Sequence, residues 1–327
     1  KYKCYVNSFD DTMLMSHCIN GGRQRHSLDS IAKDLLNHET IKLKDLIGSG
    51  KKELNFQNVP ISLAADYAAE DADMTFRAWK ILKKELIKQS VYSVYQNIDK
   101  PMVPVLIDAE LKGITVDKEQ LRRLSQFFEK KLHELETKIF SIVGVEFNIA
   151  SPKQLGEVLF EKLNLPGGKK NKSGGFQTGA DILEDLSAKG FEIASYLLEW
   201  RKMSKLKSTY SDSLMLHINN FTGRVHTSFN LAGTSTGRLS SSDPNLQNIP
   251  IRDTEGKKIR ETFIAKEGAE LLSLDYNQIE LRLLAHIADV KGLKDAFKNN
   301  IDIHASTASQ IFKVAFEKVD ASLRRKA

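Results

Sequence analysis

Asp275 stands where a carboxylate could do phosphate chemistry. The apolar run AELLSLDY, Ala269–Tyr276, predicts a buried strand, and a helical pattern begins at Gln278. Asp275 is therefore expected at a strand-to-helix junction, where a carboxylate can hold a divalent cation against a substrate phosphate. An aspartate in front of a helix is also a favoured N-cap, so the position by itself suits a structural role as well.

A second candidate pair, Tyr67 and Asp71, lies within Ser27–Leu86, whose pattern is mostly helical. The i, i+4 spacing puts both side chains on one face of the helix. A tyrosine and a carboxylate placed in this way could act together, or they could be a packed ring beside an exposed acid. The spacing leaves both interpretations open.

The elements that must position these residues form a long helical arm followed by a sheet. Asp117 and Gln120 make a capping box in front of one long helix, for which Gly144 is a suitable C-cap. Ser151 as N-cap and Pro152 at the first helical position open another helix. The seam expected to be buried along the long helix consists of Leu121, Leu124, Phe128, Leu132, Leu135, Ile139 and Ile142.

Cations and turns mark the far parts of the arm. Pro166–Gly175 is a glycine-rich basic tip, and Thr178 to Asp181 is expected to cap the helix that follows it. The helix after Gly190 ends in a basic cluster that could face a polyanionic partner or simply be a solvated helix face. Its members are Arg201, Lys202, Lys205 and Lys207.

Strand patterns begin after Gly223, where Val225, Thr227 and Phe229 alternate with polar neighbours. The arm is therefore expected to end in a sheet. The helix that begins at Gln278 is expected to bury its apolar face. That face consists of Ile279, Leu283 and Ile287.

Length and composition limit the class of protein. The 327 residues suggest two domains, and the two prolines within Asn97–Pro104 bracket the expected junction and place the boundary there. The net charge of +6, from 48 Lys and Arg against 42 Asp and Glu, permits a polyanionic partner. No apolar run approaches the roughly 18 residues of a membrane span. We expect a cytoplasmic protein without a membrane partner, in which Cys4 and Cys18 are reduced structural thiols.

Two long strings resemble motifs of one enzyme family. SLDYNQIELRLLAHIADV, Ser273–Val290, resembles the first palm carboxylate motif of family A DNA polymerases of the bacterial DNA polymerase I type, usually written DYSQIELR, with Asn277 in place of Ser. TSTGRLSSSDPNLQNIPIR, Thr234–Arg252, resembles the template and primer contact segment of the same family. SPKQLGEVLFEKLNLP, LKSTY, DIHASTA and YAAEDAD agree as well, so the resemblance covers practically the whole chain.

The resemblance implies an α+β, multi-domain fold. Residues 1–97 would be the carboxy-terminal part of a ribonuclease-H-like 3′–5′ exonuclease domain, and residues 98–327 part of a right-hand polymerase domain. Within the latter, residues 98–222 would be mainly the helical thumb, 223–290 the start of an antiparallel-sheet palm, and 291–327 the start of the fingers.

The resemblance also implies roles for individual residues. Asp275 would be one of two carboxylates that hold two Mg²⁺ ions, with the backbone carbonyl of Tyr276 as a further ligand. Primer–template DNA would be contacted by the basic cluster of the arm and by Arg238, Asn245 and Gln247. The incoming deoxynucleoside triphosphate would be contacted by Arg252, Gln278, Glu280 as steric gate, His304 and Arg324.

Tyr67 and Asp71 match the third exonuclease motif, in which Asp binds metal and Tyr orients the attacking water. Residues 1–66 contain no Asp-x-Glu pair, and the second polymerase carboxylate is not found in the chain. We therefore expect the two-ion site to be incomplete, with no proofreading and little or no primer extension by this chain alone. We also expect a nucleoid-associated monomer that still binds DNA.

Two other functions compete with the polymerase. A nuclease would use Tyr67 and Asp71, and degradation of 3′ ends that Asp71→Ala abolishes would favour it. A non-catalytic DNA-binding module would bind duplex in a salt-sensitive way whether or not Asp71 and Asp275 were intact.

Overall fold

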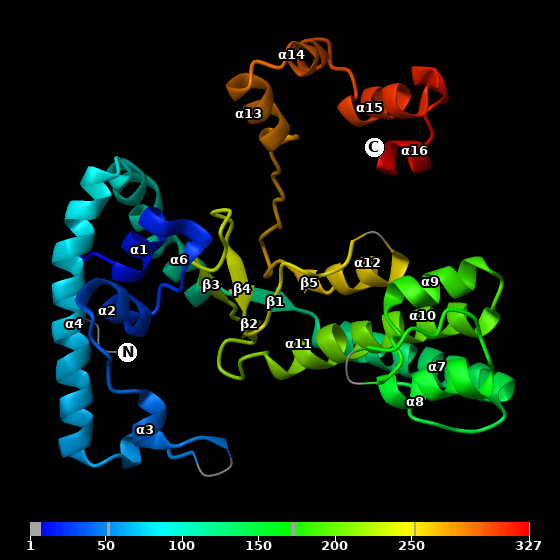
Figure 1. The fold of residues 1–327 in the computed structure, drawn as a ribbon, viewed down its shortest axis with the longest axis horizontal. Coiled ribbons are helices and arrows are strands. Elements are labelled where there is room, and N and C mark those ends of the chain that lie inside the picture. The colour runs from blue at the N-terminus through cyan, green and yellow to red at the C-terminus, as the bar shows by residue number, and fades with distance from the viewer. Residues whose placement is uncertain (1–7, 51–52, 172–173, 252, 327) are drawn as a thin grey trace. The chain divides into compact units, whose positions relative to one another are not determined.

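The computed structural model describes residues 8–50, 53–171, 174–251 and 253–326, and it contains two compact units, residues 1–269 and 270–327 (Figure 1). Helices are combined with short antiparallel strands, which confirms the α+β class. None of the helices among the described residues is long and apolar enough to cross a membrane.

Unit 1, residues 1–269, is mainly helical. Its first helices are α1 Thr12–Asn20, η1 Gly21–Arg23, α2 Leu28–Leu36, α3 Leu43–Ile47, η3 Phe56–Asn58, α4 Ile61–Lys88, α5 Tyr92–Val94, η4 Tyr95–Asp99 and α6 Lys100–Lys112. Its later helices are α7 Lys118–Val143, α8 Pro152–Glu157, η5 Val158–Lys162, α9 Ala180–Ala188, α10 Glu192–Lys205, η6 Leu206–Asp212, α11 Ser213–Leu216 and α12 Thr254–Arg260.

In the first part of unit 1, α1 and α2 pack against the long helix α4 (Figure 1). Side chains at fourfold spacing make a buried stripe along α4. This stripe consists of Met74, Ala78, Leu82 and Leu86. It meets Leu14 and Met15 of α1, Ile31 of α2 and Tyr95 in one apolar cluster.

The break predicted over Asn97–Pro104 is wrong, because α5, η4 and α6 form an uninterrupted helical run from Tyr92 to Lys112. Pro101 lies two residues after the π turn of η4, where the α-helical hydrogen-bond pattern has already changed. Pro104 follows the wider π turn of η4, where the α-helical hydrogen-bond pattern has already changed. The domain boundary placed between residues 97 and 98 stays a prediction.

The long helix of the arm, α7, begins and ends where its capping residues predict. The Asp117 carboxylate accepts a hydrogen bond from the Gln120 N–H at 2.9 Å, and Gly144 ends the helix with φ 75°. The predicted seam is buried except at Leu132, which is partly buried, and at its end, where Ile142 is 41% exposed and Val143 is buried instead. A straight helix turns every 3.6 residues, so a seam with strict heptad spacing drifts by one position over several turns.

In the rest of the arm, α10 and η6 pack on α7, and α9 packs on α10 (Figure 1). Ser151 caps α8, with Pro152 at its first position, as predicted. The cap predicted at Thr178–Asp181 is wrong: Gly179 is the N-cap residue of α9, and no side chain caps that helix. Thr178 instead accepts hydrogen bonds from the Arg201 guanidinium.

The arm ends in antiparallel strands, as predicted. The strands are β1 Ile114–Val116, β2 Arg224–Val225, β3 Ser228–Asn230, β4 Ser240–Ser242 and β5 Phe263–Ile264. β1 lies between β2 and β5, with Ile114 opposite Val225 and Val116 opposite Phe263. β3 and β4 form a separate hairpin in which Phe229 faces Ser241.

Unit 2, residues 270–327, departs most from the sequence-based expectation. Its helices are α13 Ile279–Ile287, α14 Lys291–Lys298, α15 Ile303–Phe312, η7 Phe316–Lys318 and α16 Ala321–Lys326. The strand predicted over Ala269–Tyr276 is wrong: among the described residues this run pairs with no other segment, and Leu272 and Leu274 are 81% and 83% exposed. An apolar pattern alone does not make a strand, because its N–H and C=O groups need a neighbouring strand.

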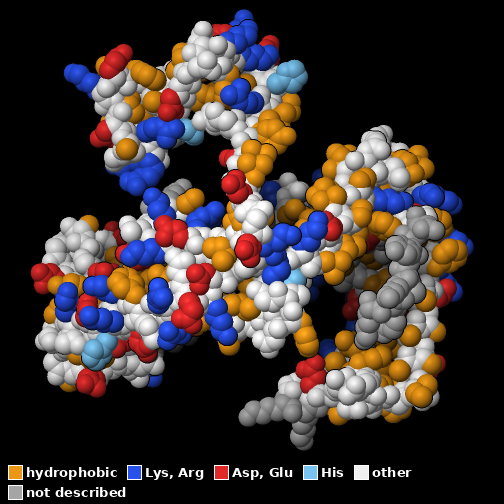
Figure 2. Space-filling model, turned by 180° about the vertical axis from the view of Figure 1, so that it is seen from behind, with side chains coloured by type: hydrophobic (Ala, Val, Ile, Leu, Met, Phe, Trp, Pro, Cys, Tyr) orange, Lys and Arg blue, Asp and Glu red, His pale blue; other side chains and the backbone are white. Residues whose placement is uncertain are grey.

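The burial predicted for α13 is wrong as well, since Ile279, Leu283 and Ile287 are exposed. Hydrophobic side chains are visible on the surface of unit 2 in Figure 2. The helix forms as the pattern predicts, but the surface that would cover its apolar face is not provided within the described part of the unit.

The packing of α7 predicts unequal effects for two apolar truncations on the same helix. Phe128→Ala removes a fully buried ring and should lower the free energy of unfolding of unit 1 by about 3–5 kcal/mol. Ile142→Ala, at an exposed position, should change it by no more than about 0.5 kcal/mol. Urea denaturation followed by circular dichroism measures both, and equal losses would contradict the predicted seam.

Candidate functional site

The segment that follows β4 is shaped by polar contacts with its own residues and with the start of the strand. Asn245 Oδ1 accepts a hydrogen bond from the Gln247 N–H at 3.0 Å, and Gln247 Nε2 donates to the Leu239 carbonyl oxygen at 2.9 Å. Ser241 Oγ accepts a hydrogen bond from the Leu246 N–H at 3.1 Å. These contacts fold residues 239–247 back on the hairpin and keep Asn245 and Gln247 at the surface.

Arg238 lies in the connection between β3 and β4 and is exposed. Its carbonyl oxygen accepts a hydrogen bond from Thr234 Oγ1 at 2.7 Å, so the backbone at Arg238 is tied to the start of the loop. The structure therefore exposes three of the predicted DNA-contacting residues on the two segments that flank β4, Arg238 before the strand and Asn245 and Gln247 after it. The fourth residue of this segment with a predicted role, Arg252, lies outside the described residues.

Of the basic cluster at the end of α10, three members bind groups of the chain itself. Arg201 Nη1 donates to the Thr178 carbonyl oxygen at 2.6 Å, and burial lowers the pKa of the guanidinium. Lys202 Nζ lies 2.8 Å from Glu255 Oε2, and Lys207 Nζ lies 2.8 Å from Asp212 Oδ2. Burial works against the charge of Lys202, but the nearby carboxylates outweigh it and raise the pKa of the ammonium.

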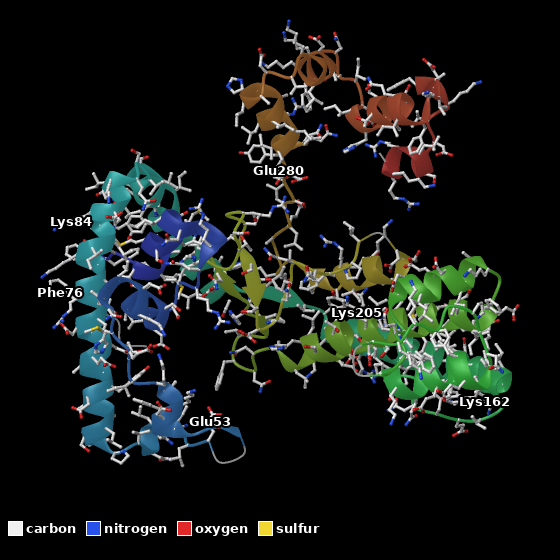
Figure 3. All side chains as sticks on the ribbon, viewed as in Figure 1. Glu53, Phe76, Lys84, Lys162, Lys205 and Glu280 are labelled. Atoms are coloured by element: carbon white, nitrogen blue, oxygen red, sulfur yellow. The ribbon has the colours of Figure 1, made fainter. Side chains whose placement is uncertain are left out.

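Lys205 differs from these three because it is exposed at the end of α10, where it is labelled in Figure 3. The sequence pattern does not distinguish the four cations, because each falls in one basic run. Only the fold separates a lysine that faces solvent from cations held by Glu255, Asp212 and the backbone.

The carboxylate motif around Asp275 in unit 2 is exposed to solvent. Asp275 is exposed, Tyr276 is 81% exposed, and Glu280 lies in the first turn of α13 (Figure 3). The N-cap position of α13 belongs to Gln278, with φ 52°, so the alternative that Asp275 caps this helix is wrong.

A metal site needs several oxygen or nitrogen ligands close together. In the described ranges, no group of three or more His, Cys, Asp and Glu residues could hold a metal ion. Asp275 and the Tyr276 carbonyl are therefore two candidate ligands, and by themselves they do not fit a two-ion site.

Asp302 brings Arg324 of α16 to the start of α15, where His304 lies. Asp302 caps this helix by accepting a hydrogen bond from the Ala305 N–H at 3.1 Å, and its other oxygen accepts one from Arg324 Nε at 2.7 Å. The contact with Arg324 holds the pKa of Asp302 below its ordinary value. Because His304 lies in the first turn of the same helix, the two predicted phosphate contacts stand at one helix end.

Tyr67 and Asp71 lie one turn apart on α4, as predicted. Burial, followed by the charge and the hydrogen bond of Asp71, raises the pKa of the Tyr67 hydroxyl. Asp71 also lines an open cleft of about 580 Å³, together with Asp10, Phe76 and Trp79. The Tyr67 ring packs on Phe56, with 6.1 Å between the ring centroids.

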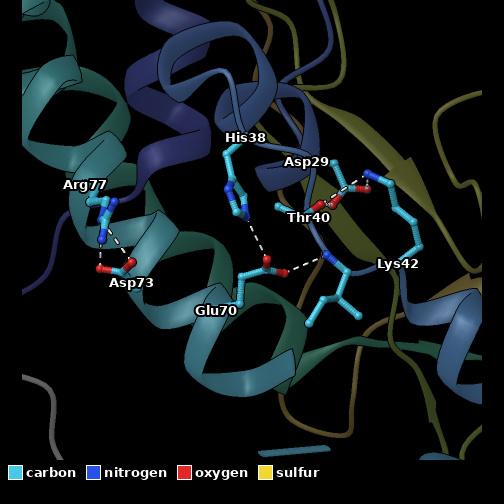
Figure 4. Close-up of polar contacts among 8 residues, drawn as sticks. Asp29, His38, Thr40, Lys42, Glu70, Asp73 and Arg77 are labelled. Carbon is cyan, nitrogen blue, oxygen red and sulfur yellow. Dashed lines mark hydrogen bonds and ion pairs between the residues drawn. The ribbon is translucent and has the colours of Figure 1, made fainter. Parts of the chain in front are cut away.

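Glu70 beside Asp71 makes contacts that the sequence did not indicate. Its two oxygens bind His38 Nε2 at 2.7 Å and the Ile41 N–H at 2.6 Å (Figure 4). The hydrogen bond from His38, followed by that from Ile41, lowers the pKa of Glu70. This carboxylate joins the segment after α2 to α4, next to the Tyr67 and Asp71 pair.

Asp10 is a second missed carboxylate, and it organises the cleft that Asp71 lines. It accepts hydrogen bonds from Trp79 Nε1 at 2.8 Å, from Lys100 Nζ at 2.9 Å and from the Tyr95 hydroxyl at 3.0 Å. Burial raises the pKa of Asp10, but these donors outweigh that effect and hold the value below the ordinary one. Its donors lie 69 to 90 residues away, so no local pattern could reveal the cluster.

Comparison with known proteins agrees with this arrangement of motifs. The model of DNA polymerase family A matches residues 118–327, and that of a 3′–5′ exonuclease matches residues 1–87. The chain is 48% identical to DNA polymerase I of Rhizobium leguminosarum over 327 residues, which are 100% of this chain and 32% of the relative. It is 45% identical to DNA polymerase I of Pseudomonas aeruginosa over 318 residues, which are 97% of this chain and 35% of the relative.

A solved structure is similar as well: the POL domain of Pol1 from M. smegmatis in complex with DNA primer-template and dNTP. The TM-score is 0.83 at 34% sequence identity, and the match covers 97% of this chain and 52% of that one.

The fold and motifs define a polymerase-type chain with an exonuclease-like amino-terminal region. This chain belongs to DNA polymerase family A. It spans about a third of the length of the two relatives named above.

The Asp10 cluster predicts a dependence of stability on acid. Because folding lowers the pKa of Asp10 below 3.8, its contribution is complete above that value and is lost as the pH falls through the lower folded value. Asp10→Asn should therefore destabilise unit 1 more at about pH 7 than at about pH 3, where part of the contribution of the ionised carboxylate is already lost.

Urea midpoints at the two pH values measure this effect. Asp108→Asn is the matched control, since Asp108 makes an exposed ion pair with Lys112 and should matter little at either pH. Equal destabilisation by Asp10→Asn at both pH values would contradict the assigned role.

Proposed function

We propose that this chain is part of a DNA-directed DNA polymerase and binds primer–template DNA for template-directed deoxynucleotidyl transfer in replication and repair. The observation that carries the proposal is the exposure of Arg238, Asn245 and Gln247 on the two segments that flank β4, within the region that matches DNA polymerase family A. Arg offers a fork of donors to phosphate and base edges, and Asn and Gln offer paired donors and acceptors. The relative from M. smegmatis, in complex with DNA primer-template and dNTP, supports both partners.

The proposed catalytic group is Asp275, as one ligand of a two-ion Mg²⁺ site to which the Tyr276 carbonyl contributes. Bound metal would polarise the primer hydroxyl and the phosphates. The part of Asp275 is to present an ionised carboxylate from an exposed segment, and Gln278 and Glu280 follow it at the start of α13. His304 and Arg324, at the start of α15, are proposed contacts for nucleotide phosphates together with Arg252.

The proposed DNA surface of the arm centres on Lys205, because Arg201, Lys202 and Lys207 bind the chain itself. These three cations would hold the helix end in place and add positive charge beside Lys205. The working form is proposed to be a cytoplasmic, nucleoid-associated monomer.

A 3′–5′ exonuclease is the second candidate, favoured by the match of residues 1–87 and by the contact of Tyr67 with Asp71. In this proposal Asp71 is a metal ligand and Tyr67 orients the attacking water. Since the described residues hold no cluster of three metal ligands, we expect this chain to leave single-stranded 3′ ends intact.

DNA binding by the chain itself tests the proposed partner. Lys205→Ala should weaken primer–template binding and lower the slope of log K against log salt by about 1, because one phosphate contact is lost. Fluorescence anisotropy over a range of salt concentrations measures both quantities. Lys83→Ala is the matched control, since Lys83 lies on α4 above the Trp79 ring. A slope unchanged by Lys205→Ala would count against this surface.

The chemistry is tested in a chimera in which this chain replaces the matched segment of DNA polymerase I of Rhizobium leguminosarum. Primer extension by the chimera should fall about 100-fold or more on Asp275→Asn, because a ligand for transition-state charge is lost. Asp289→Asn, at an exposed carboxylate of the same unit, should leave the rate near that of the parent chimera. Equal rates for the two variants would remove Asp275 from the mechanism.

A further inference from the structure

We infer that the exonuclease-like region positions the primer-contact loop. His17 of α1 is the positioning residue, and Gly22 of η1 lets the loop backbone come close to η1. The loop is the segment Thr234–Arg238, and its role in DNA contact rests on the proposed function. We call the contacts of His17 and Gly22 with this loop the brace. All of them lie within unit 1.

The first contact is a hydrogen bond across 217 residues of sequence: His17 Nε2 lies 2.9 Å from the carbonyl oxygen of Thr234. A carbonyl oxygen can only accept, so Nε2 carries the proton and donates it. The hydroxyl of Thr234 in turn donates to the Arg238 carbonyl oxygen at 2.7 Å. Thr234 therefore links the imidazole to the backbone that presents Arg238.

The second contact is a close approach of two backbones. A Cβ atom at Gly22 would lie 2.1 Å from Ser235 Cβ and 3.0 Å from Ser235 Cα. The φ of Gly22 is −81°, which any residue can adopt, so contact with the loop, and not local backbone conformation, requires glycine here.

A buried histidine holds both contacts in place. His26 Nε2 donates to the Gly21 carbonyl oxygen at 2.7 Å, and Nδ1 accepts from Ser16 Oγ at 3.0 Å. The His26 ring also meets the His17 ring edge-on, with centroids 5.3 Å apart and planes at 86°. Since both nitrogens of His26 are engaged, the turn at Gly21 and the orientation of His17 are fixed together.

The base of the hairpin is held by different groups. Glu110 of α6 accepts a hydrogen bond from the Phe229 N–H at 2.6 Å, and the Thr227 hydroxyl donates to the Pro244 carbonyl oxygen at 2.8 Å. The His17 contact instead reaches the middle of the connection between β3 and β4. Its loss should release the loop and leave the hairpin paired.

Limited proteolysis of the full chain tests the brace without DNA. Trypsin cleaves after Arg238, and the initial rate of this cleavage, measured by mass spectrometry, reports opening of the loop. His17→Ala should raise the rate about three- to tenfold, because one hydrogen bond is lost. His17→Gln, which keeps an N–H donor of similar reach, should stay near the wild-type rate. His133→Ala, on the exposed face of α7, is the matched control.

Gly22→Ala tests the close approach independently. It should raise cleavage after Arg238 in the same way, and a second change, Ser235→Gly, should bring the rate back toward the wild type by removing the atom that the new methyl group meets. Gly292→Ala is the matched control because a Cβ there has open space.

Primer–template affinity of the same variants tests the positioning. The Kd should rise about three- to tenfold for His17→Ala and for Gly22→Ala, and it should recover in His17→Gln and in the double variant. Unchanged cleavage in His17→Ala and Gly22→Ala overturns the brace. Increased cleavage with unchanged affinity overturns its role in DNA contact. If the wild-type chain binds no primer–template, the proposed function fails, and the brace is judged by cleavage alone.

Discussion

The burial of one face of α7 is the constraint on which the arm depends. Its first half packs Leu121 and Phe128 into a cluster with η6 and the sheet, and its second half packs Ile139 and Val143 into a cluster with α8, η5, α9 and α10. Both apolar cores of the arm therefore share a single helix. This arrangement fixes where α10 ends, and with it the location of the basic cluster and of the hairpin that follows.

Once the helices are packed, internal polar partners decide which charges face solvent. Arg201, Lys202 and Lys207 satisfy a backbone carbonyl and nearby carboxylates, while Lys205 extends outward. The same kind of pairing occurs in the amino-terminal region, where Asp10 gathers three donors and Glu70 gathers two. A half-buried charge needs such partners because burial disfavours the ionised form.

Cys18 illustrates how the surroundings of a residue decide its chemistry. Its thiol donates a hydrogen bond to Asp99 Oδ2 at 2.7 Å, and burial together with that carboxylate raises the pKa of the thiol to about 12. A thiol with so high a pKa is a poor nucleophile and a poor metal ligand. Cys18 is a free cysteine among the described residues, Cys4 lies outside them, and the expectation of reduced structural thiols stays a prediction.

The sequence by itself determined the elements whose causes are local: the capped start of α7 at Asp117, its end at Gly144, the start of α8 at Ser151 and the pairing of Tyr67 with Asp71 on one helix face. It also determined the family, because long motifs carry far more information than composition. Only the tertiary structure decided that Ala269–Tyr276 forms no strand, that α13 leaves its apolar face open and that His17 reaches Thr234. Capping and helical periodicity act over a few residues, whereas burial, strand pairing and partner choice depend on segments brought together from distant parts of the chain.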